Sequence, residues 1–378
     1  MEKPFLRRFT KNIFIVSNLI IAAGFLAGSY VKNLSPARWW FFGLFTFVLA
    51  YLLLALLVFF LFWLLKKSFW CFISLVTIIA AWHAVINIFP LNFSSSFSIR
   101  KKNPESLRIM SWNVEQFNIL HYKEGPEVKQ QMLDLINEYD PDIACLQEVV
   151  AGDKKKSINY FPDIKRTLRF TDYLYSYSVK DDFDNNHHFG RIIFSKFPII
   201  NKQTVVNYPN DYNATFQYVD VLKDRDTIRI FNVHLQSLKF TKANLSYLDK
   251  AGLNSDSNIT ESKSIISKLK NGLLKRSIQA NFIKDEINHS PYPVIVCGDF
   301  NDVPNSYAYE TIGAGLQNAF VEKGSGIART FSTISPTLRI DNIFADKKFT
   351  VLQFTRIKKL LSDHFPIIAD LILSQNTK

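Results

Sequence analysis

The chain has 378 residues, more than one ordinary domain needs, and a net charge of +12. The charge is unevenly placed, because residues 1–100 hold nine Lys or Arg side chains against one acidic residue, Glu2. The rest of the chain carries only +4, so overall basicity gives no argument for a nucleic-acid substrate. Cys71, Cys145 and Cys297 lie in apolar runs without a CxxC or Cys/His neighbour, so they are predicted to be buried thiols.

The first quarter of the chain contains three apolar stretches, each near the length of about 20 residues that a helix needs to cross a bilayer. They run over 13–31, 40–65 and 69–89. Lys32 and Arg38 separate the first two, and Lys66 and Lys67 separate the second from the third. A cleavable signal peptide would not be followed by two further stretches. The sequence therefore predicts a membrane anchor of three transmembrane helices over residues 1–92.

The distribution of basic residues predicts the orientation of this anchor. Four Lys or Arg side chains lie within residues 3–11, and Lys66 and Lys67 follow the second stretch, which favours a cytoplasmic N-terminus. Three crossings would then place the C-terminal domain outside the cytoplasm. The basic run 100–102, just after the third stretch, is the contrary observation.

Two polar residues, His83 and Asn87, lie in the last turns of the third stretch. A polar residue inside a membrane suggests a functional site, but placement near the interface costs little. A transporter would usually need more spans and polar residues at the midplane. A small transporter with an appended domain stays an alternative, and it predicts solute flux through the first 90 residues.

Residues 93–105 are polar and are predicted to form a short flexible linker to a second domain, residues 106–378. Short β-rich runs alternate there with amphipathic helical runs, which is typical of a mixed α/β domain. A helix is predicted over 127–139. The predicted strands are 107–118, 142–149, 191–199, 227–237, 293–302, 338–346 and 365–373.

Polar side chains follow several of these apolar runs. Strands hold such groups rigidly while loops converge on them, so a cluster at strand ends is typical of an active site. A single one would be an ordinary hydrogen-bonded residue, but eight in six separate segments predict a site. Their carboxylates, amides and histidines suit hard metal ions and proton transfer near neutral pH. The eight are Asn113, Glu148, His234, Asp299, Asn301, Asp341, Asp363 and His364.

Six segments together resemble the successive motifs of the endonuclease/exonuclease/phosphatase superfamily. They are WNVEQFN, LQEV, NVHLQS, CGDFND, RIDNIF and LSDHFPI, and the similarity covers about 106–373. The resemblance implies a four-layer αββα sandwich with its site at one end, preceded here by the three transmembrane helices. It also implies metal-dependent hydrolysis of phosphate esters.

The resemblance assigns three metal ligands. Glu148 of LQEV matches the principal ligand, Asn113 of WNV matches the amide beside it, and Asp363 of SDH is similar to a further acidic group. All three offer oxygen atoms, which Mg²⁺ and Mn²⁺ prefer, whereas a zinc site would need more His or Cys. Mg²⁺ or Mn²⁺ is therefore the expected cofactor, and the number of ions stays open.

The resemblance also implies five catalytic residues. His364 matches the histidine next to the scissile phosphate, and Asp341 matches the acid that orients it. Asp299 and Asn301 match the pair that positions the attacking water and the phosphoryl oxygens, and His234 matches the second histidine. Donors such as Asn301 and His234 would neutralise charge that develops on the phosphoryl oxygens. The proton of the water goes to Asp299 or to the Asp341–His364 pair, and both routes stay open.

Three other features have two interpretations each. Glu115, two residues after Asn113, is either a further metal contact or an exposed loop carboxylate. Arg191 contacts a substrate phosphate or, as we favour, is a solvated charge at a strand end. His187 and His188 match no motif and are predicted at the surface.

Residues 239–276 form an insertion with eight Lys or Arg against three acids. Such a segment grips phosphates or anionic lipid headgroups, or it is a solvated insertion with a basic helix, which we favour.

The fold does not select the substrate, which is nucleic acid, a phospholipid or sphingolipid headgroup, or a sugar phosphate. The membrane anchor raises the case for a lipid. A catalytically inactive, membrane-tethered binding module is the alternative to an enzyme, and no motif indicates a protein partner.

Overall fold

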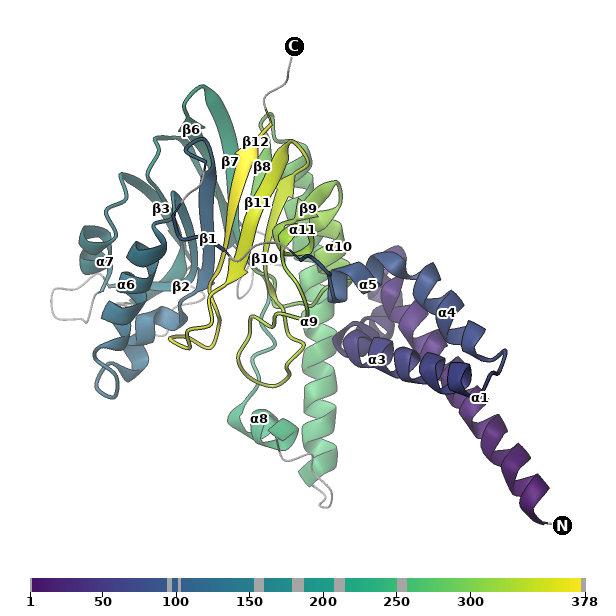
Figure 1. Ribbon diagram of the computed structural model, residues 1–378. Helices are drawn as coiled ribbons and strands as arrows, with labels where there is room; N and C mark the ends of the chain where they lie inside the picture. The colour runs from purple at the N-terminus through teal and green to yellow at the C-terminus, as the bar shows by residue number, and fades with distance from the viewer. Residues whose placement is uncertain are drawn as a thin grey trace.

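The computed structural model describes residues 2–93, 97–100, 103–152, 160–178, 187–206, 215–249 and 257–374. Outside these described residues lie Lys101 and Lys102 of the basic run, 94–96 of the linker, 250–256 of the insertion and 375–378 at the end of the predicted domain. Figure 1 shows two parts, a bundle of helices from the first quarter of the chain and a sandwich of two sheets from the remainder.

Apolar helices form the bundle. Phe14 packs on Phe62 with 5.0 Å between ring centroids, Ser74 Oγ donates to Asn18 Oδ1 at 2.9 Å, and the Tyr30 hydroxyl donates to the Ala80 carbonyl. These contacts place the helices at 44–65 and 71–80 beside the first helix. The sandwich lies at the end of the bundle opposite the N-terminus (Figure 1). The elements are α1 (Glu2–Ser29), η1 (Val31–Asn33), α2 (Pro36–Trp39), η2 (Trp40–Gly43), α3 (Leu44–Leu65), α4 (Cys71–Ala80) and α5 (Trp82–Ile88).

The third apolar stretch differs from the single span that the sequence predicts. Among the described residues, Arg8–Ser29 and Pro36–Leu65 are long and apolar enough to cross a membrane. The stretch 69–89 instead forms α4 and α5, bent by 78° at a break, so the spans number two, or three if the bent pair is one span. The bend gives His83 and Asn87 of α5 polar partners in the sandwich, and an unpaired buried polar group would be costly.

Two six-stranded sheets form the sandwich, with all seven predicted strands among them. Strands β1 and β2 are parallel in the first sheet, as are β7 and β8 in the second, and the other strand pairs are antiparallel. The first sheet has the order β11 (Phe349–Arg356), β12 (Ile367–Leu373), β1 (Leu107–Asn113), β2 (Ile143–Gly152), β4 (His187–Ser195), β3 (Asp172–Tyr177). The second has the order β5 (Ile199–Val206), β6 (Thr215–Lys223), β7 (Asp226–His234), β8 (Val294–Asp299), β10 (Asp341–Asp346), β9 (Leu316–Asn318).

Helices cover the outer face of each sheet and complete four layers. Side chains alternate along each strand, so Ile109 of β1 lies between the sheets while Met110 packs against Leu133 of α6. Cys145 and Cys297 are free thiols buried between the sheets, as predicted. The predicted αββα sandwich is therefore confirmed. The covering elements are α6 (Val128–Tyr139) and α7 (Phe161–Thr167) on the first sheet, and α9 (Ser257–Asn288) and α10 (Tyr307–Gly313) on the second, with η3 (Glu115–His121), α8 (Lys242–Asp249) and α11 (Ala319–Lys323) between strands.

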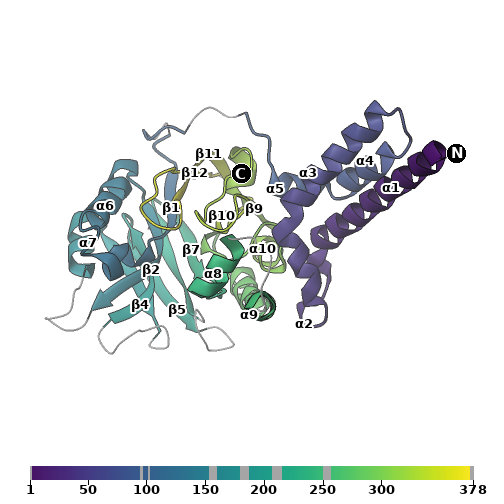
Figure 2. The same cartoon turned by 90° about the horizontal axis from the view of Figure 1, so that it is seen from below.

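The described part of the basic insertion forms helix α8 and the N-terminal part of α9, which extend together beyond the end of the sandwich in Figure 1 and point toward the viewer in Figure 2. The described part of the predicted linker is held to the sandwich, because the backbone N–H of Ser98 donates to Gln353 Oε1 at 2.9 Å. Arg108 also donates to the Ser98 carbonyl at 3.1 Å.

Candidate active site

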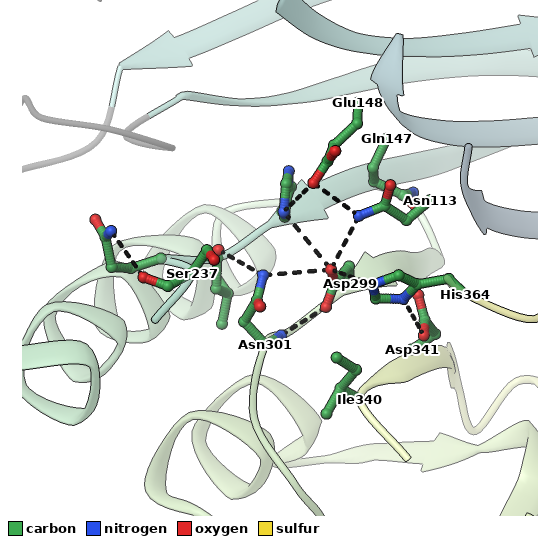
Figure 3. A network of polar contacts seen from close by, with 12 residues as sticks. Asn113, Gln147, Glu148, Ser237, Asp299, Asn301, Ile340, Asp341 and His364 are labelled. Atoms are coloured by element: carbon green, nitrogen blue, oxygen red, sulfur yellow. Dashed lines mark hydrogen bonds and ion pairs between the residues drawn. The ribbon is translucent and has the colours of Figure 1, made fainter. Parts of the chain in front are cut away.

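The candidate site lies where the ends of strands from both sheets meet. Asn113 ends β1 and Glu148 follows Gln147 in the neighbouring strand β2. In the second sheet, Asp299 is in register with His234 of β7 on one side and with Asp341 of β10 on the other. Figure 3 shows Asn113 and Glu148 from the first sheet facing Asp299 from the second.

Two backbone features make this arrangement possible. Gly298 has φ +146, and a Cβ on it would lie 1.9 Å from the Val233 carbonyl oxygen, so only glycine lets β8 approach β7 here. Glu148 sits at a shift of register between Gln147 and Val149, with φ 55, a left-handed conformation that costs a non-glycine residue about 1 kcal/mol. The bulge interrupts the regular alternation of side chains along β2, and the Glu148 carboxylate is thereby turned toward the site.

Asp299 lies at the centre of the polar network. Its Oδ1 accepts from the backbone N–H of Asn301 at 2.7 Å, and its Oδ2 accepts from Asn113 Nδ2 at 3.2 Å and Asn301 Nδ2 at 3.3 Å. Burial, and to a lesser extent Asp341, raise the pKa of Asp299 to about 7, although His364 and these hydrogen bonds act in the opposite direction. A carboxyl group with such a pKa can accept or donate a proton at neutral pH.

His364 is fixed by contacts on both sides of its ring. Nδ1 lies 2.9 Å from Asp341 Oδ2, and Nε2 lies 3.6 Å from Asp299 Oδ2. Burial acts to lower the pKa of His364, but Asp341 and Asp299 outweigh it and raise the pKa well above 6.5. The ring is therefore an imidazolium at neutral pH, and its two aspartates compensate the buried charge.

His234 has the opposite electrostatics. Its Nε2 lies 3.6 Å from Asp299 Oδ2 and 3.8 Å from Glu148 Oε1. Burial, followed by the positive charges of Arg191 and His364, lowers the pKa of His234 well below 6.5. His234 is therefore neutral at pH 7, so the site holds two histidines in different protonation states.

Carboxylates gather on the first-sheet side of the site. Glu148 accepts from Asn113 Nδ2 at 3.1 Å and from Gln116, while Glu115 Oε2 accepts from the backbone N–H of Asp363 at 3.0 Å. Burial raises the pKa of both Glu148 and Glu115, and the charge of Asp363 raises each further. Such mutual repulsion is what a divalent cation would relieve.

The carboxylates of this group fit a hard cation, but the amide of Asn113 is not oriented to bind one. Glu148, Glu115 and Asp363 offer carboxylate oxygens alone, the chemistry that Mg²⁺ and Mn²⁺ take. Asn113 Nδ2 donates to Glu148 and to Asp299. Asn113 Oδ1 accepts from the backbone N–H of Glu115 at 3.2 Å. Its oxygen would have to leave that N–H to contact a metal ion.

A second group of possible ligand atoms also lies in the site. Atoms of Asp299, Asp341 and His364 all lie within 4.8 Å of one another. Since Nδ1 of His364 is bound by Asp341 and Nε2 faces Asp299, this group is better explained as a hydrogen-bonded proton-transfer set than as a ligand set. Asn113 connects the two groups, because its Nδ2 donates to Glu148 on one side and to Asp299 on the other.

The structure brings all eight sequence-predicted residues into one site, and it decides the open interpretations. Glu115 lies in the carboxylate group and not on an exposed loop. Arg191 is 2% exposed, so the solvated charge that we favoured is wrong; the strand β4 buries it near His234. His187 and His188 are half-buried in β4, where His188 stacks on Tyr177.

Sequence reasoning missed the residues that support the site. Gln116 donates to Glu148. Thr330 Oγ1 accepts from the backbone N–H groups of Ile340 at 2.9 Å and Asp341 at 3.0 Å. Ser362 Oγ accepts from the backbone N–H of His364 at 3.1 Å. Gln116 and Ser362 lie inside the quoted motifs, whereas Thr330 lies outside any motif and carries no local signal.

The fold and this site define a phosphoesterase architecture, and comparison with known proteins agrees. Residues 110–364 match the model of the Endonuclease/Exonuclease/phosphatase family, so the chain belongs to this family, whose members hydrolyse phosphoester bonds. Residues 11–88 match a second family, described as a domain of unknown function.

Relatives of the sandwich are distant in sequence. The chain is 24% identical over 257 residues to the uncharacterized protein YbhP of Escherichia coli strain K12, covering 64% of this chain and 88% of YbhP. The structure of an endonuclease/exonuclease/phosphatase from Beutenbergia cavernae aligns with a TM-score of 0.52 at 17% identity, over 71% of this chain and 72% of that one. A family protein from Bacteroides thetaiotaomicron aligns with a TM-score of 0.51 at 18% identity, over 71% and 98%. These structures share the fold of the sandwich.

Proposed function

We propose that the protein is a membrane-anchored hydrolase of phosphodiester or phosphomonoester bonds that depends on Mg²⁺ or Mn²⁺. The observation that carries the proposal is the position of Asp299, which lies between the His364 imidazolium, held by Asp341, and the carboxylates around Glu148. Hydrolysis of a phosphate ester needs proton-transfer groups, which His364 and Asp299 supply, and a bound cation, which the carboxylates around Glu148 would hold. The cation and the imidazolium compensate the negative charge of the phosphate while water attacks.

In the proposed reaction, a water molecule attacks the phosphorus in line with the leaving oxygen, and Asp299 takes its proton. A pKa of about 7 for Asp299 supports this role, whereas His364 is already protonated and is better suited to donate to a phosphoryl oxygen. Asn301 and neutral His234 donate further hydrogen bonds as charge builds on the phosphoryl oxygens. The reaction forms the P–O bond to water, breaks the bond to the leaving group, and requires no covalent enzyme intermediate.

The metal would be held by Glu148, Asp363 and Asn113, with Glu115 as a further ligand. When bound, it supplies positive charge to the phosphate oxygens. Asp341 takes no proton in this scheme, and its role is to keep His364 oriented and cationic. Asp299 and Asn301 from the second sheet, and His364, which precedes β12 of the first sheet, perform the remaining functions.

We also propose that residues 1–92 anchor the protein in a bilayer, that 93–105 connect the two parts, and that 106–378 form the catalytic domain outside the cytoplasm. The sandwich and the N-terminus lie at opposite ends of the bundle, which supports opposite sides of the bilayer for them, and the basic residues within 3–11 assign the cytoplasmic side to the N-terminus (Figure 1). Protease added to intact cells with a permeabilised outer layer should cleave the sandwich. Complete protection, with cleavage only after lysis, would reverse the orientation.

A substrate panel tests the proposed activity. The full chain, purified in detergent and reconstituted in nanodiscs, would be assayed in Mg²⁺ and in Mn²⁺ with plasmid DNA, RNA, sphingomyelin, phosphoinositides and simple phosphate esters. His364→Ala, purified in parallel, controls for contaminating hydrolases. Release of a phosphoryl product by wild type alone supports an enzyme. Binding of a panel member without turnover, in either metal, would instead identify a catalytically inactive binding module.

A further inference from the structure

Helix α5 contacts the sandwich through buried polar groups as well as apolar surface. Asn87 Nδ2 donates to Asn305 Oδ1 at 2.9 Å, and Asn305 Nδ2 donates back to the Ala84 carbonyl at 3.2 Å. Asn87 is 5% exposed and Asn305 is 1% exposed. Buried reciprocal hydrogen bonds of this kind fix the relative position of two segments, because separating them leaves polar groups without partners.

Asn305 belongs to the loop that carries Asn301. This loop leaves β8 after Asp299 and ends where Ser306 caps α10. Asn305 has φ 68, a left-handed conformation that asparagine tolerates better than most residues. Its side chain is thereby directed to α5, four residues after the side chain that we place at the phosphoryl oxygens.

The segment before Asp341 is attached to α5 as well. Arg339 donates to the backbone carbonyl of Asn87 and, at 3.2 Å, to the Ile327 carbonyl, and it is 2% exposed. Arg339 precedes Asp341 by two residues at the entrance to β10. One residue of α5, Asn87, therefore contacts both the loop that carries Asn301 and the segment that leads to Asp341.

Further contacts extend this junction on both sides. Glu310 of α10 accepts from Asn87 Nδ2 at 3.0 Å and from Lys32 Nζ at 2.9 Å, and it lies 3.2 Å from His83 Nε2. After α5, the N–H of Gly326 donates to the Pro90 carbonyl at 3.0 Å.

A second connection runs through α9. Arg276 of this helix contacts Asp302, the residue after Asn301, at 3.0 Å in a fully buried ion pair. One turn earlier in α9, Leu273 packs on Gly43 of the bundle. Two turns earlier, the ammonium of Lys270 lies 5.4 Å from the centroid of the Trp40 ring, also in the bundle. The GDFND loop is thus held between α5, which belongs to the bundle, and α9, which contacts the bundle.

We propose that the membrane segment is a structural part of the active site, in which Asn87 of α5 acts as a positioning residue for Asn301 and Asp341. A tether alone would need no buried polar contacts with catalytic loops. Transition-state stabilisation depends on donors held within a fraction of an ångström, so loosening these segments should lower turnover more than substrate binding. The kinetic part of this inference rests on the proposed function.

The test uses the full chain in phosphatidylcholine nanodiscs, with Asn87→Ala and Asn305→Gly. Glycine accepts the backbone conformation of residue 305, so the second variant removes the contact from the sandwich side even where Asn87→Ala fails to insert. Ser74→Ala is the matched control, because it removes a buried hydrogen bond to Asn18 that joins α4 to α1 within the bundle.

Two readouts decide the inference. Hydrogen exchange of residues 300–306, the loop that the Asn87–Asn305 contact holds, should become faster in both variants and stay at the wild-type rate in the control. On the best panel substrate, kcat should fall by about tenfold, with KM within about twofold. Wild-type exchange together with wild-type kcat in both variants would overturn the inference. If wild type itself turns over no substrate, the proposed function fails, and hydrogen exchange alone decides the positioning role.

Discussion

His364 and Asp341 join the two sheets of the sandwich through one hydrogen bond of 2.9 Å. His364 lies just before β12 of the first sheet, and Asp341 begins β10 of the second. The second ring nitrogen of His364 is left facing Asp299 at 3.6 Å. The pair therefore fixes the orientation of the imidazole at the point where strands from both sheets end.

Replacement of His364 by alanine should lower kcat by about 10²- to 10⁴-fold, the usual contribution of a positioned proton-transfer or charge-stabilising group. Affinity for Mg²⁺ should stay close to wild type, because Glu148 and Glu115 come from other elements and the substitution keeps Asp363. Steady-state kinetics and metal titration measure the two quantities. Wild-type turnover on the best substrate would disprove the assigned role.

Asp341→Asn should reproduce part of that loss. An amide keeps the size of the side chain but removes the charge that raises the pKa of His364, and so favours the neutral ring. The ¹H,¹⁵N signals of the His364 imidazole should then titrate at lower pH than in wild type. The same imidazole titration in both proteins would show that Asp341 does not set the charge of His364.

Chelation of divalent cations should abolish activity, and Mg²⁺ or Mn²⁺ should restore it. Glu148→Gln should increase the concentration of Mg²⁺ required for half-maximal activity, since it removes a charged oxygen ligand and keeps the shape. His364→Ala should leave that concentration nearly unchanged. Full activity in excess chelator would exclude the proposed metal dependence.

The junction at Glu310 should weaken in acid. Burial acts to raise the pKa of Glu310, but His83 and Lys32 outweigh it and lower the pKa below the ordinary 4.5. Ionised Glu310 thus stabilises the fold fully above the unfolded pKa, and this stability is lost as pH falls through the folded pKa. Between about pH 5 and pH 3, the Tm of wild type should fall more than that of Glu310→Gln. Asp285→Asn, at an exposed carboxylate of α9, should follow wild type.

Gly298→Ala should destabilise the sandwich by about 3 kcal/mol or more, because the new Cβ would lie 1.9 Å from the Val233 carbonyl oxygen. Gly315→Ala is the matched control: it also has positive φ, but nothing lies within 4 Å of its added Cβ. Chemical denaturation should therefore show a smaller loss for Gly315→Ala. Equal losses would mean that φ alone, and not the close approach of β7 and β8, requires glycine at residue 298.

The strands that sequence periodicity missed are mostly those at sheet edges. β3 and β11 border the first sheet, and β5 and β9 border the second. An edge strand is half-exposed, so its alternation of apolar and polar residues is weak, as the exposed positions along β5 illustrate. The buried inner strands β1, β2, β8 and β12 were predicted because their apolar runs are continuous.

The sequence by itself determined the three apolar stretches, the inner strands and the eight polar residues at their ends, because each is a local pattern of residue types. Only the tertiary structure decided what those residues contact. It bent the third stretch so that Asn87 reaches Asn305, buried Arg191 near His234, and paired His364 with Asp341 across two sheets. Such contacts join residues distant in the chain, and their energies depend on burial and on the partner, neither of which a local pattern contains.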